Sequence, residues 1–135
     1  LLASVFFRIA NDAARYINTS TSDLPDGEVD TYILESHGKH KKDAPSGTAA
    51  YLKNMLSKEI DSDIQIYSIR AGNDTGTHEV IFTNMDNETI KLTYNSGGRV
   101  TYVKGIFLAC KKILKLEPGL YHLTEHSEGL TGIER

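Results

Sequence analysis

The order in which helical and strand patterns follow one another constrains the fold of this chain most. Apolar residues recur at helical spacing over 1–17, and residues 28–36 are rich in β-branched and aromatic types, as strands are. The same patterns predict helices over 46–59 and 99–114 and strands over 64–70, 77–84, 88–95 and 120–123. This order predicts an α+β fold, an open mixed four-stranded sheet with helices on one face.

Such a sheet leaves its second face without cover from the chain itself. In water, an apolar face of this kind is usually buried by another subunit or domain. The first and third helices are expected to turn apolar stripes toward the core. These stripes comprise Leu2, Val5, Phe6, Ile9, Ala13, Tyr16 and Ile17 in the first helix and Val103, Ile106, Phe107, Cys110, Ile113 and Leu114 in the third. The polar tail from Thr124 onward is expected to be loose.

Length and composition restrict the class of protein. A chain of 135 residues corresponds to one domain. Cys110 has no second cysteine to pair with, which excludes an internal disulfide and a multi-cysteine metal site and fits the reducing cytoplasm. No apolar run approaches the roughly 20 residues of a membrane span, and residues 1–17 lack the basic start of a signal peptide.

Positive charge is concentrated in one short segment of an otherwise acidic chain. The net charge is −3, yet residues 37–42 hold three lysines, two histidines and no acidic residue. This distribution disfavours nonspecific nucleic-acid binding and favours one small anionic ligand. Neither G-x-G-x-x-G nor G-x-x-x-x-G-K-[ST] occurs, so the chain carries no recognisable nucleotide-phosphate loop.

The start of the second predicted helix has the features of an anion site. Ser46 is a plausible N-cap, and the following turn, residues 47–50, contains no acidic residue. Unbonded N–H groups together with the hydroxyls of Ser46 and Thr48 would receive an anion, and Gly47 would let it approach the backbone closely.

Proton-transfer groups precede this helix start. His37 ends the strand, and His40 and Lys41 follow within a few residues. Histidine exchanges protons near neutral pH, and a lysine held among other cations shifts toward its neutral form and becomes a usable acid. Anion site and proton-transfer groups together suit a small carboxylate substrate that receives a proton.

Simpler interpretations of the same residues stand beside this one. A run of charges is most often a solvated loop, a single histidine is most often structural, and Ser46 caps a helix in either case. A metal site built from His37, His40 and Asp43 matches no zinc pattern, and the neighbouring lysines would oppose a cation, so no metal is predicted.

Residues 35–49, E-S-H-G-K-H-K-K-D-A-P-S-G-T-A, resemble a family signature. The signature is E-x-H-H-x-x-K-x-D-A-P-S-G-T-A, of 4-hydroxy-tetrahydrodipicolinate reductase, also called dihydrodipicolinate reductase. Residues 70–82 are similar to the family's R-x-G-x-x-x-G-x-H-x-V-x-F segment, residues 99–105 to its S-R-x-x-F-A-x-G helix start, and residues 119–121 to its final G-L-Y/F element. The resemblance covers nearly the whole chain in order.

The resemblance implies an oxidoreductase that reduces a cyclic dicarboxylate of the lysine and diaminopimelate pathway with NADH or NADPH. It implies that His37 is a catalytic acid/base and Lys41 the proton donor, and that Ser46, Gly47 and Thr48 hold a substrate carboxylate. The family's second histidine, a substrate-binding residue, is replaced here by Gly38. His40, two residues further on, is the candidate to take its place.

The resemblance also implies the domain organisation. Residues 1–135 would be the substrate-binding and oligomerisation domain, which assembles a homotetramer, and the N-terminal dinucleotide-binding domain would be absent from this chain. Two alternatives remain open. One is a paralogue that binds another carboxylate or only assembles, which Gly38 favours, and the other is a stand-alone anion-binding module without catalysis.

Overall fold

The computed structural model describes residues 2–21, 29–119, 121–123 and 130–132. The helices and strands, in chain order, are α1 (Leu2–Ser20), β1 (Val29–His37), α2 (Gly47–Leu56), β2 (Gln65–Arg70), β3 (Thr77–Asn84), β4 (Thr89–Asn95), α3 (Arg99–Ile113), β5 (Tyr121–Leu123) and β6 (Leu130–Gly132).

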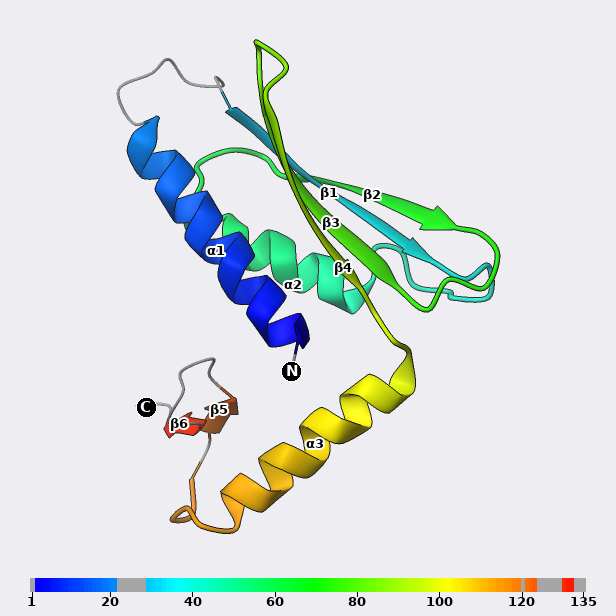
Figure 1. Cartoon of the computed structure of the whole chain (residues 1–135), viewed down its shortest axis with the longest axis vertical. Helices are drawn as coiled ribbons and strands as arrows, with labels where there is room; N and C mark the ends of the chain where they lie inside the picture. The colour runs from blue at the N-terminus through cyan, green and yellow to red at the C-terminus, as the bar shows by residue number, and fades with distance from the viewer. Residues whose placement is uncertain (1, 22–28, 120, 124–129, 133–135) are drawn as a thin grey trace.

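The first four strands form one mixed sheet in the order β2-β1-β3-β4 (Figure 1). β1 runs parallel to β2 and antiparallel to β3, and β4 is antiparallel to β3. Parallel neighbours need a crossover, which α2 supplies between β1 and β2. The predicted open, mixed, four-stranded sheet is therefore confirmed.

Helices α1 and α2 pack on one face of this sheet and enclose the core (Figure 1). The aromatic rings of Phe6 on α1 and Tyr94 on β4 stack with centroids 5.5 Å apart. The core consists of the buried residues Phe6, Ala10, Ala14, Ile33, Ala49, Leu52, Leu56, Ile64, Val80, Phe82 and Tyr94. The predicted apolar stripe of α2 is part of it.

The predicted stripe of α1 is only partly correct. Phe6 is buried and Ala13 and Ile17 pack against the core, but small residues, Ala10 and Ala14, are the positions at closest approach. Four predicted core residues are instead exposed by 45–68%, namely Leu2, Val5, Ile9 and Tyr16. The apolar residues of α1 extend beyond the strip that the sheet covers, and their spacing alone does not show which of them will be buried.

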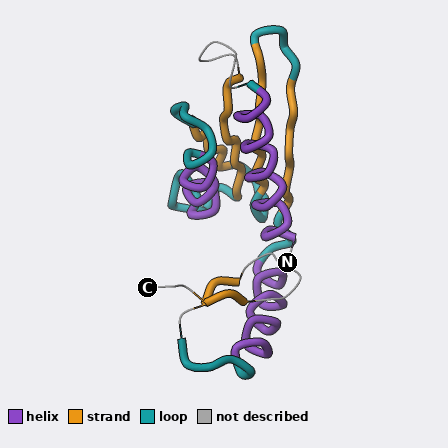
Figure 2. Tube along the Cα trace, turned by 90° about the vertical axis from the view of Figure 1, so that its left-hand side faces the viewer, coloured by secondary structure: helices purple, strands orange, loops and turns teal. Residues whose placement is uncertain are grey.

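Helix α3 corrects a second expectation. It extends away from the sheet beyond β4 (Figures 1 and 2), and its apolar stripe covers no core of the described residues. Val103, Ile106, Phe107, Ile113 and Leu114 are exposed by 51–86%, and Cys110 is exposed as well. The helical spacing correctly predicted a helix with an apolar stripe, but the described residues do not bury that stripe.

The far face of the sheet is also uncovered by the described residues. Tyr67 and Ile69 are exposed by 55% and 45% there, beside Tyr32, whose ring meets that of Tyr67 edge-on. Ile81 is buried at its centre. No helix among the described residues has the length and apolar character needed to cross a membrane.

The C-terminal residues require one more correction. The tail was expected to be loose, but Leu130–Gly132 forms β6, which pairs antiparallel with Tyr121–Leu123 of β5. The tail residues 124–129 and 133–135 lie outside the described residues, as does Leu120, where the last strand was predicted to begin. The other predicted boundaries fall within three residues of the observed ones.

Candidate active site

Two loops that follow the parallel strands β1 and β2 lie together at one edge of the sheet. The backbone N–H groups of Gly38 and Lys39 donate to the carbonyls of Asp74 (2.8 Å) and Gly72 (3.1 Å). The N–H of Ala71 donates to the carbonyl of His37 at 3.0 Å. Residues far apart in the sequence are thereby fixed beside one another, because parallel strands end at the same edge.

An open pocket of about 470 Å³ lies at this edge. It contains three of the predicted site residues, His37, His40 and Lys41, together with Tyr102 from the first turns of α3. The remaining lining comes from the two loops, through Gly38, Gly72, Asn73, Asp74 and Thr75. The structure thus brings both predicted catalytic residues into one pocket.

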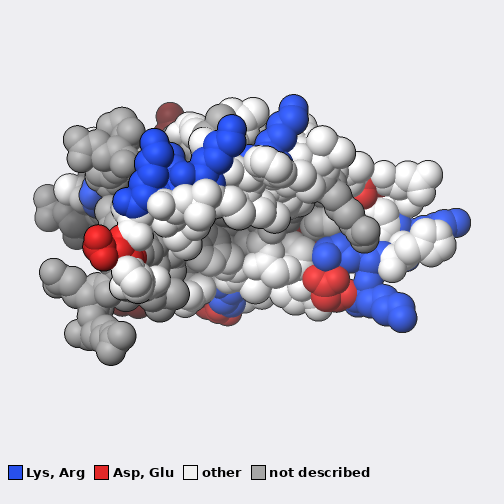
Figure 3. Space-filling view, turned by 90° about the horizontal axis from the view of Figure 1, so that it is seen from below, with Lys and Arg blue, Asp and Glu red and all other residues white. Residues whose placement is uncertain are grey.

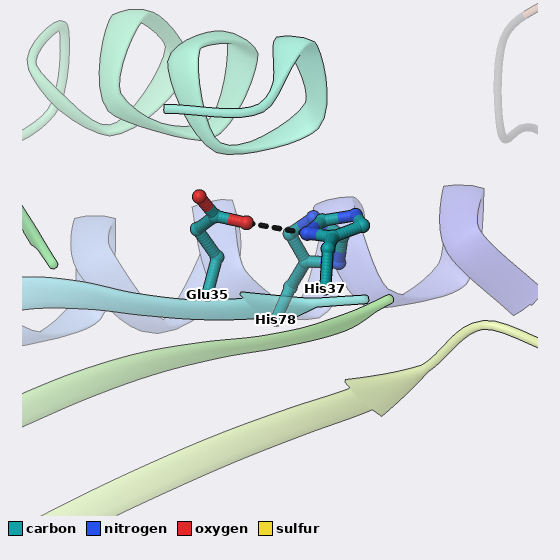
Figure 4. A group of neighbouring side chains, drawn as sticks. All are labelled: Glu35, His37 and His78. Carbon is teal, nitrogen blue, oxygen red and sulfur yellow. Dashed lines mark hydrogen bonds and ion pairs between the residues drawn. The ribbon is translucent and has the colours of Figure 1, made fainter. Parts of the chain in front are cut away.

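A buried carboxylate contacts the imidazole of His37. Glu35 is fully buried on β1, two residues before His37 and on the same face of the strand. Its Oε2 lies 2.5 Å from Nδ1 of His37, and its Oε1 accepts hydrogen bonds from Arg70 (2.6 Å) and from the backbone N–H of Ser46 (3.4 Å). Figure 4 shows Glu35 and His37 rising from β1 beside His78 of β3.

The ionisation of Glu35 follows from these contacts. Burial raises the pKa of the carboxyl, but hydrogen bonds from Arg70, Ser68 and His37 and the charge of Arg70 outweigh burial and lower it to about 2. Glu35 is therefore a carboxylate throughout the physiological range, and it accepts hydrogen bonds without donating any.

His78 is the second histidine of the buried layer. It is 1% exposed, its ring meets that of His37 edge-on at 5.1 Å, and its Nε2 lies 3.2 Å from the hydroxyl of Ser46. Burial, reinforced by the charge of His37, lowers the pKa of His78 to about 4, so the ring is neutral at pH 7. Glu35, His37, Ser46, Arg70 and His78 are called the buried network below.

The N-terminus of α2 has the predicted cap. The hydroxyl of Ser46 accepts a hydrogen bond from the N–H of Ala49 at 3.2 Å and is also hydrogen-bonded to Nε2 of His78. Ser46 is 2% exposed, so its hydroxyl faces the interior. Gly47 and Thr48 begin the helix, where backbone N–H groups have no acceptor within the helix, and an added side chain at Gly47 would meet nothing within 4 Å.

The basic loop, residues 38–43, is far more exposed than the network beneath it. Lys39, His40 and Lys42 are exposed, and the side chain of Lys41 is 29% exposed. The ammonium of Lys41 pairs with Asp43 at 2.8 Å, and this hydrogen bond lowers the pKa of the aspartate. On the whole face seen from the α3 end, one group of basic side chains forms a row along an edge (Figure 3). A separate group of basic side chains lies among acidic ones.

A set of possible metal ligands exists, but it differs from the one considered in the sequence. Atoms of Glu35, His37 and His78 lie within 4.8 Å of one another, and neither His40 nor Asp43 takes part. Both oxygens of Glu35 are engaged, one with the guanidinium of Arg70. A cation there would have to displace a charge-paired guanidinium from a buried carboxylate, which makes the site unfavourable for a metal.

Sequence reasoning missed several residues of this site. Glu35, Arg70 and His78 stand in the quoted motifs but were given no role, and Tyr102 was not considered. The parallel register of β1 and β2, which sets Glu35 opposite Ser68 and His37 opposite Arg70, is the signal that would have found the network. This register can be used only when it is known which strands pair, and residue periodicity alone does not show that.

The fold and site define a small α+β domain with a histidine and a lysine in one pocket. The other predicted site residues, Ser46, Gly47 and Thr48 at the capped start of α2, are not part of the lining of that pocket. The family model described as dihydrodipicolinate reductase, C-terminus, matches residues 3–126. The chain belongs to this family of C-terminal domains.

Relatives and a solved structure agree with this assignment. Proteins named 4-hydroxy-tetrahydrodipicolinate reductase from Methanosarcina acetivorans and Aquifex aeolicus are 31% and 33% identical over 90% and 87% of this chain, each match covering 48% of the relative. One from Akkermansia muciniphila is 30% identical, with 88% of this chain and 56% of that protein covered. The chain therefore spans about half the length of the curated relatives it matches.

The fold similarity extends to a solved structure with a bound ligand. Dipicolinate-bound dihydrodipicolinate reductase from Paenisporosarcina sp. TG-14 matches with a TM-score of 0.67 at 20% identity, covering 90% of this chain and 49% of that one. At this identity the similarity establishes the shared fold.

Proposed function

We propose that this chain is the substrate-binding half of an NAD(P)H-dependent 4-hydroxy-tetrahydrodipicolinate reductase of lysine and diaminopimelate biosynthesis. The observation that carries the proposal is that the family match runs through residues 3–126 and that His37 and Lys41, which the family resemblance makes the acid/base and the proton donor, line one pocket. No finding favours a paralogue without this activity, even with Gly38 in place of the family histidine.

In this proposal the pocket holds a small cyclic dicarboxylate. Lys41 and His40, which line the pocket, would supply positive charge and hydrogen bonds. Gly47 and Thr48 do not line it, and they would bind one carboxylate at the positive end of α2 through their N–H groups and the Thr48 hydroxyl. Ser46 contributes by capping the helix rather than by a free hydroxyl. Lys41 would exchange Asp43 for the substrate and deliver a proton, and His37 would act as the acid/base.

The nicotinamide cofactor, NADH or NADPH, would supply the hydride. This chain contains no dinucleotide phosphate loop, so its residues do not fit the binding of the cofactor's phosphates. A second domain would hold the cofactor. The uncovered apolar face of α3, with Ile106 and Phe107 exposed by 61% and 66%, supports the presence of a further packed partner.

The uncovered face of the sheet supports assembly. Tyr32, Tyr67 and Ile69 form an apolar surface there, and a homotetramer built on this face accords with the family resemblance. The lone Cys110, exposed and unpaired, accords with the reducing cytoplasm as the place of action. Analytical ultracentrifugation of the full-length gene product would test the oligomeric state.

The function is tested by assaying the full-length gene product with the cyclic dicarboxylate and each nicotinamide cofactor. Lys41→Ala should lower kcat by roughly 10²- to 10⁴-fold, because a positioned proton donor is lost. Lys39→Ala is the matched control, since Lys39 is exposed and does not line the pocket. Absence of dicarboxylate-dependent cofactor oxidation in the unmodified protein would refute the proposal.

Ligand binding provides a separate test. Pyridine-2,6-dicarboxylate, a planar analogue of the proposed substrate, should bind the protein in calorimetry, and Thr48→Val and Lys41→Ala should each weaken binding at least tenfold. Unchanged affinity in both variants would place the ligand elsewhere.

A further inference from the structure

The contact between Glu35 and His37 fixes where the histidine carries its proton. Glu35 is fully buried, and its Oε2 lies 2.5 Å from Nδ1 of His37. Two donors, Arg70 Nη2 at 2.6 Å and the backbone N–H of Ser46 at 3.4 Å, converge on the other carboxylate oxygen. A carboxylate held by a guanidinium accepts hydrogen bonds, so the hydrogen of the short contact belongs to Nδ1 of His37.

The opposite edge of the His37 imidazole, at Nε2, lies against Gly76. Nε2 of His37 has no hydrogen-bond partner among the described residues, and it faces Gly76. A Cβ at Gly76 would lie 2.9 Å from Nε2, closer than Cβ atoms come to their neighbours, and 3.3 Å from Cδ2, which is a tight contact. Gly76 has φ +131, a conformation that other residues rarely adopt. Glycine at position 76 therefore avoids a clash with Nε2, and no described residue forms a hydrogen bond with that nitrogen.

Glu35 does more than form a buried ion pair with Arg70. An ion pair between Glu35 and Arg70 would be complete without His37, because Arg70 and Ser46 both donate to Oε1 and leave Oε2 to the histidine. His37 lines the pocket, whereas Glu35 does not reach it. The carboxylate thus acts on the pocket through the histidine.

We propose that Glu35 is a positioning residue for proton transfer at His37. Held by Arg70, it fixes the neutral imidazole as the tautomer with hydrogen on Nδ1. The lone pair of Nε2, which no described residue engages, can then accept a proton, and Nε2 can return it. Glu35 also stabilises the imidazolium formed in between, and the proton never passes to its carboxylate. The catalytic consequence rests on the proposed function, but the tautomer does not.

The tautomer is tested by ¹⁵N NMR of the His37 imidazole in the unmodified protein. For the neutral imidazole, we expect a protonated Nδ1 and an unprotonated Nε2. A hydrogen on Nε2 in the unmodified protein would overturn the proposal, and this measurement needs neither a variant nor enzymatic activity.

Glu35→Gln tests the role of the carboxylate while keeping the shape of the side chain. We expect a mixed tautomer at His37 and a kcat lower by roughly 10²- to 10⁴-fold with little change in KM, measured on the full-length gene product. Glu59→Gln is the matched control, because Glu59 contacts Asn11 away from the pocket. A folded Glu35→Gln protein with an unchanged tautomer and unchanged kcat would overturn the proposal.

Partial recovery by the conservative variant separates positioning from simple stability. Glu35→Asp keeps the negative charge, but the shorter side chain holds it further from His37. The Nδ1–H tautomer should therefore return, while kcat stays between the values of Glu35→Gln and the unmodified protein. If the unmodified protein shows the expected tautomer but reduces no dicarboxylate, the proposed function fails and the tautomer assignment stands.

Discussion

The basic loop and the buried network contain similar charged groups, and they differ in how much water surrounds them. In the loop, Lys41 pairs with Asp43 at 2.8 Å with side chains 29% and 57% exposed. In the network, Arg70 pairs with Glu35 at 2.6 Å with side chains 16% and 0% exposed. The two N–O distances are nearly equal, so the two ion pairs differ in burial and not in length.

This difference assigns the two regions different tasks. An exposed ion pair contributes little to stability because water and salt screen it, and its lysine remains available to a ligand. Breaking a buried pair leaves an uncompensated charge in the interior. The conspicuous basic run therefore offers ligand chemistry at little structural cost, while the inconspicuous residues beneath it hold the site in shape.

The largest expected effect is on stability, from Arg70→Ala. Glu35 would lose its guanidinium while remaining buried, which should lower the free energy of unfolding by about 3–5 kcal/mol. Urea unfolding measures this. The control Lys39→Ala, on the exposed loop, should stay within about 0.5 kcal/mol of the unmodified protein. Equal losses in the two variants would remove the distinction between the regions.

Acid should destabilise the buried network in two steps. The folded-state pKa of His78, about 4, is below its ordinary 6.5, so the unfolded chain takes up that proton first and stability falls between pH 6.5 and 4. The folded-state pKa of Glu35, about 2, is below its ordinary 4.5, so a second loss follows between pH 4.5 and 2. Each step amounts to about 3 kcal/mol at most.

Unfolding free energies measured across this range check the assignment. His78→Gln should flatten the dependence between pH 6.5 and 4 and keep the loss below 4.5, since Glu35 is untouched. The same slope in both proteins between pH 6.5 and 4 would show that another group controls it.

The parts of the molecule that could be predicted depend on local pattern. Helix and strand order, the Ser46 cap and the strand Thr77–Asn84 follow from residue spacing and from side chains that bond to their own neighbours. His37 and Lys41 could be proposed as candidates because they stand in one short basic run, and the structure places both in one pocket.

The parts that could not be predicted depend on pairing and on covering surfaces. Arg70 reaches Glu35 only because β1 and β2 are parallel and in register, which neither strand encodes alone. The stripe of α3 was expected to be buried because Phe107 and Ile106 repeat at helical spacing. That spacing shows that a helix has an apolar face, and it does not show whether this chain supplies the surface that covers it.

Gly76→Ala should have an intermediate effect. The added Cβ would lie 2.9 Å from Nε2 of His37 in a backbone with φ +131, so the variant should lose about 1–3 kcal/mol and displace the imidazole. Gly72→Ala, with φ +56 but nothing within 4 Å, bears conformational strain without a clash and is the matched control. Unfolding measurements and His37 NMR shifts should separate the two, and an unshifted His37 in Gly76→Ala would contradict the contact.

The smallest effect is expected for Asp43→Asn in the basic loop. Asp43 has the lowered pKa of a paired carboxylate, through the hydrogen bond from Lys41, but its side chain is 57% exposed. Solvent would replace Lys41 as the partner of this side chain, so the free energy of unfolding should change no more than in the exposed-loop variant Lys39→Ala. The backbone carbonyl of Asp43, which accepts a hydrogen bond from Arg70 at 2.7 Å, is unchanged by the substitution. A loss of stability clearly larger than that of Lys39→Ala would mean that the Lys41 pair stabilises the loop, and that the loop and the network form one structural unit.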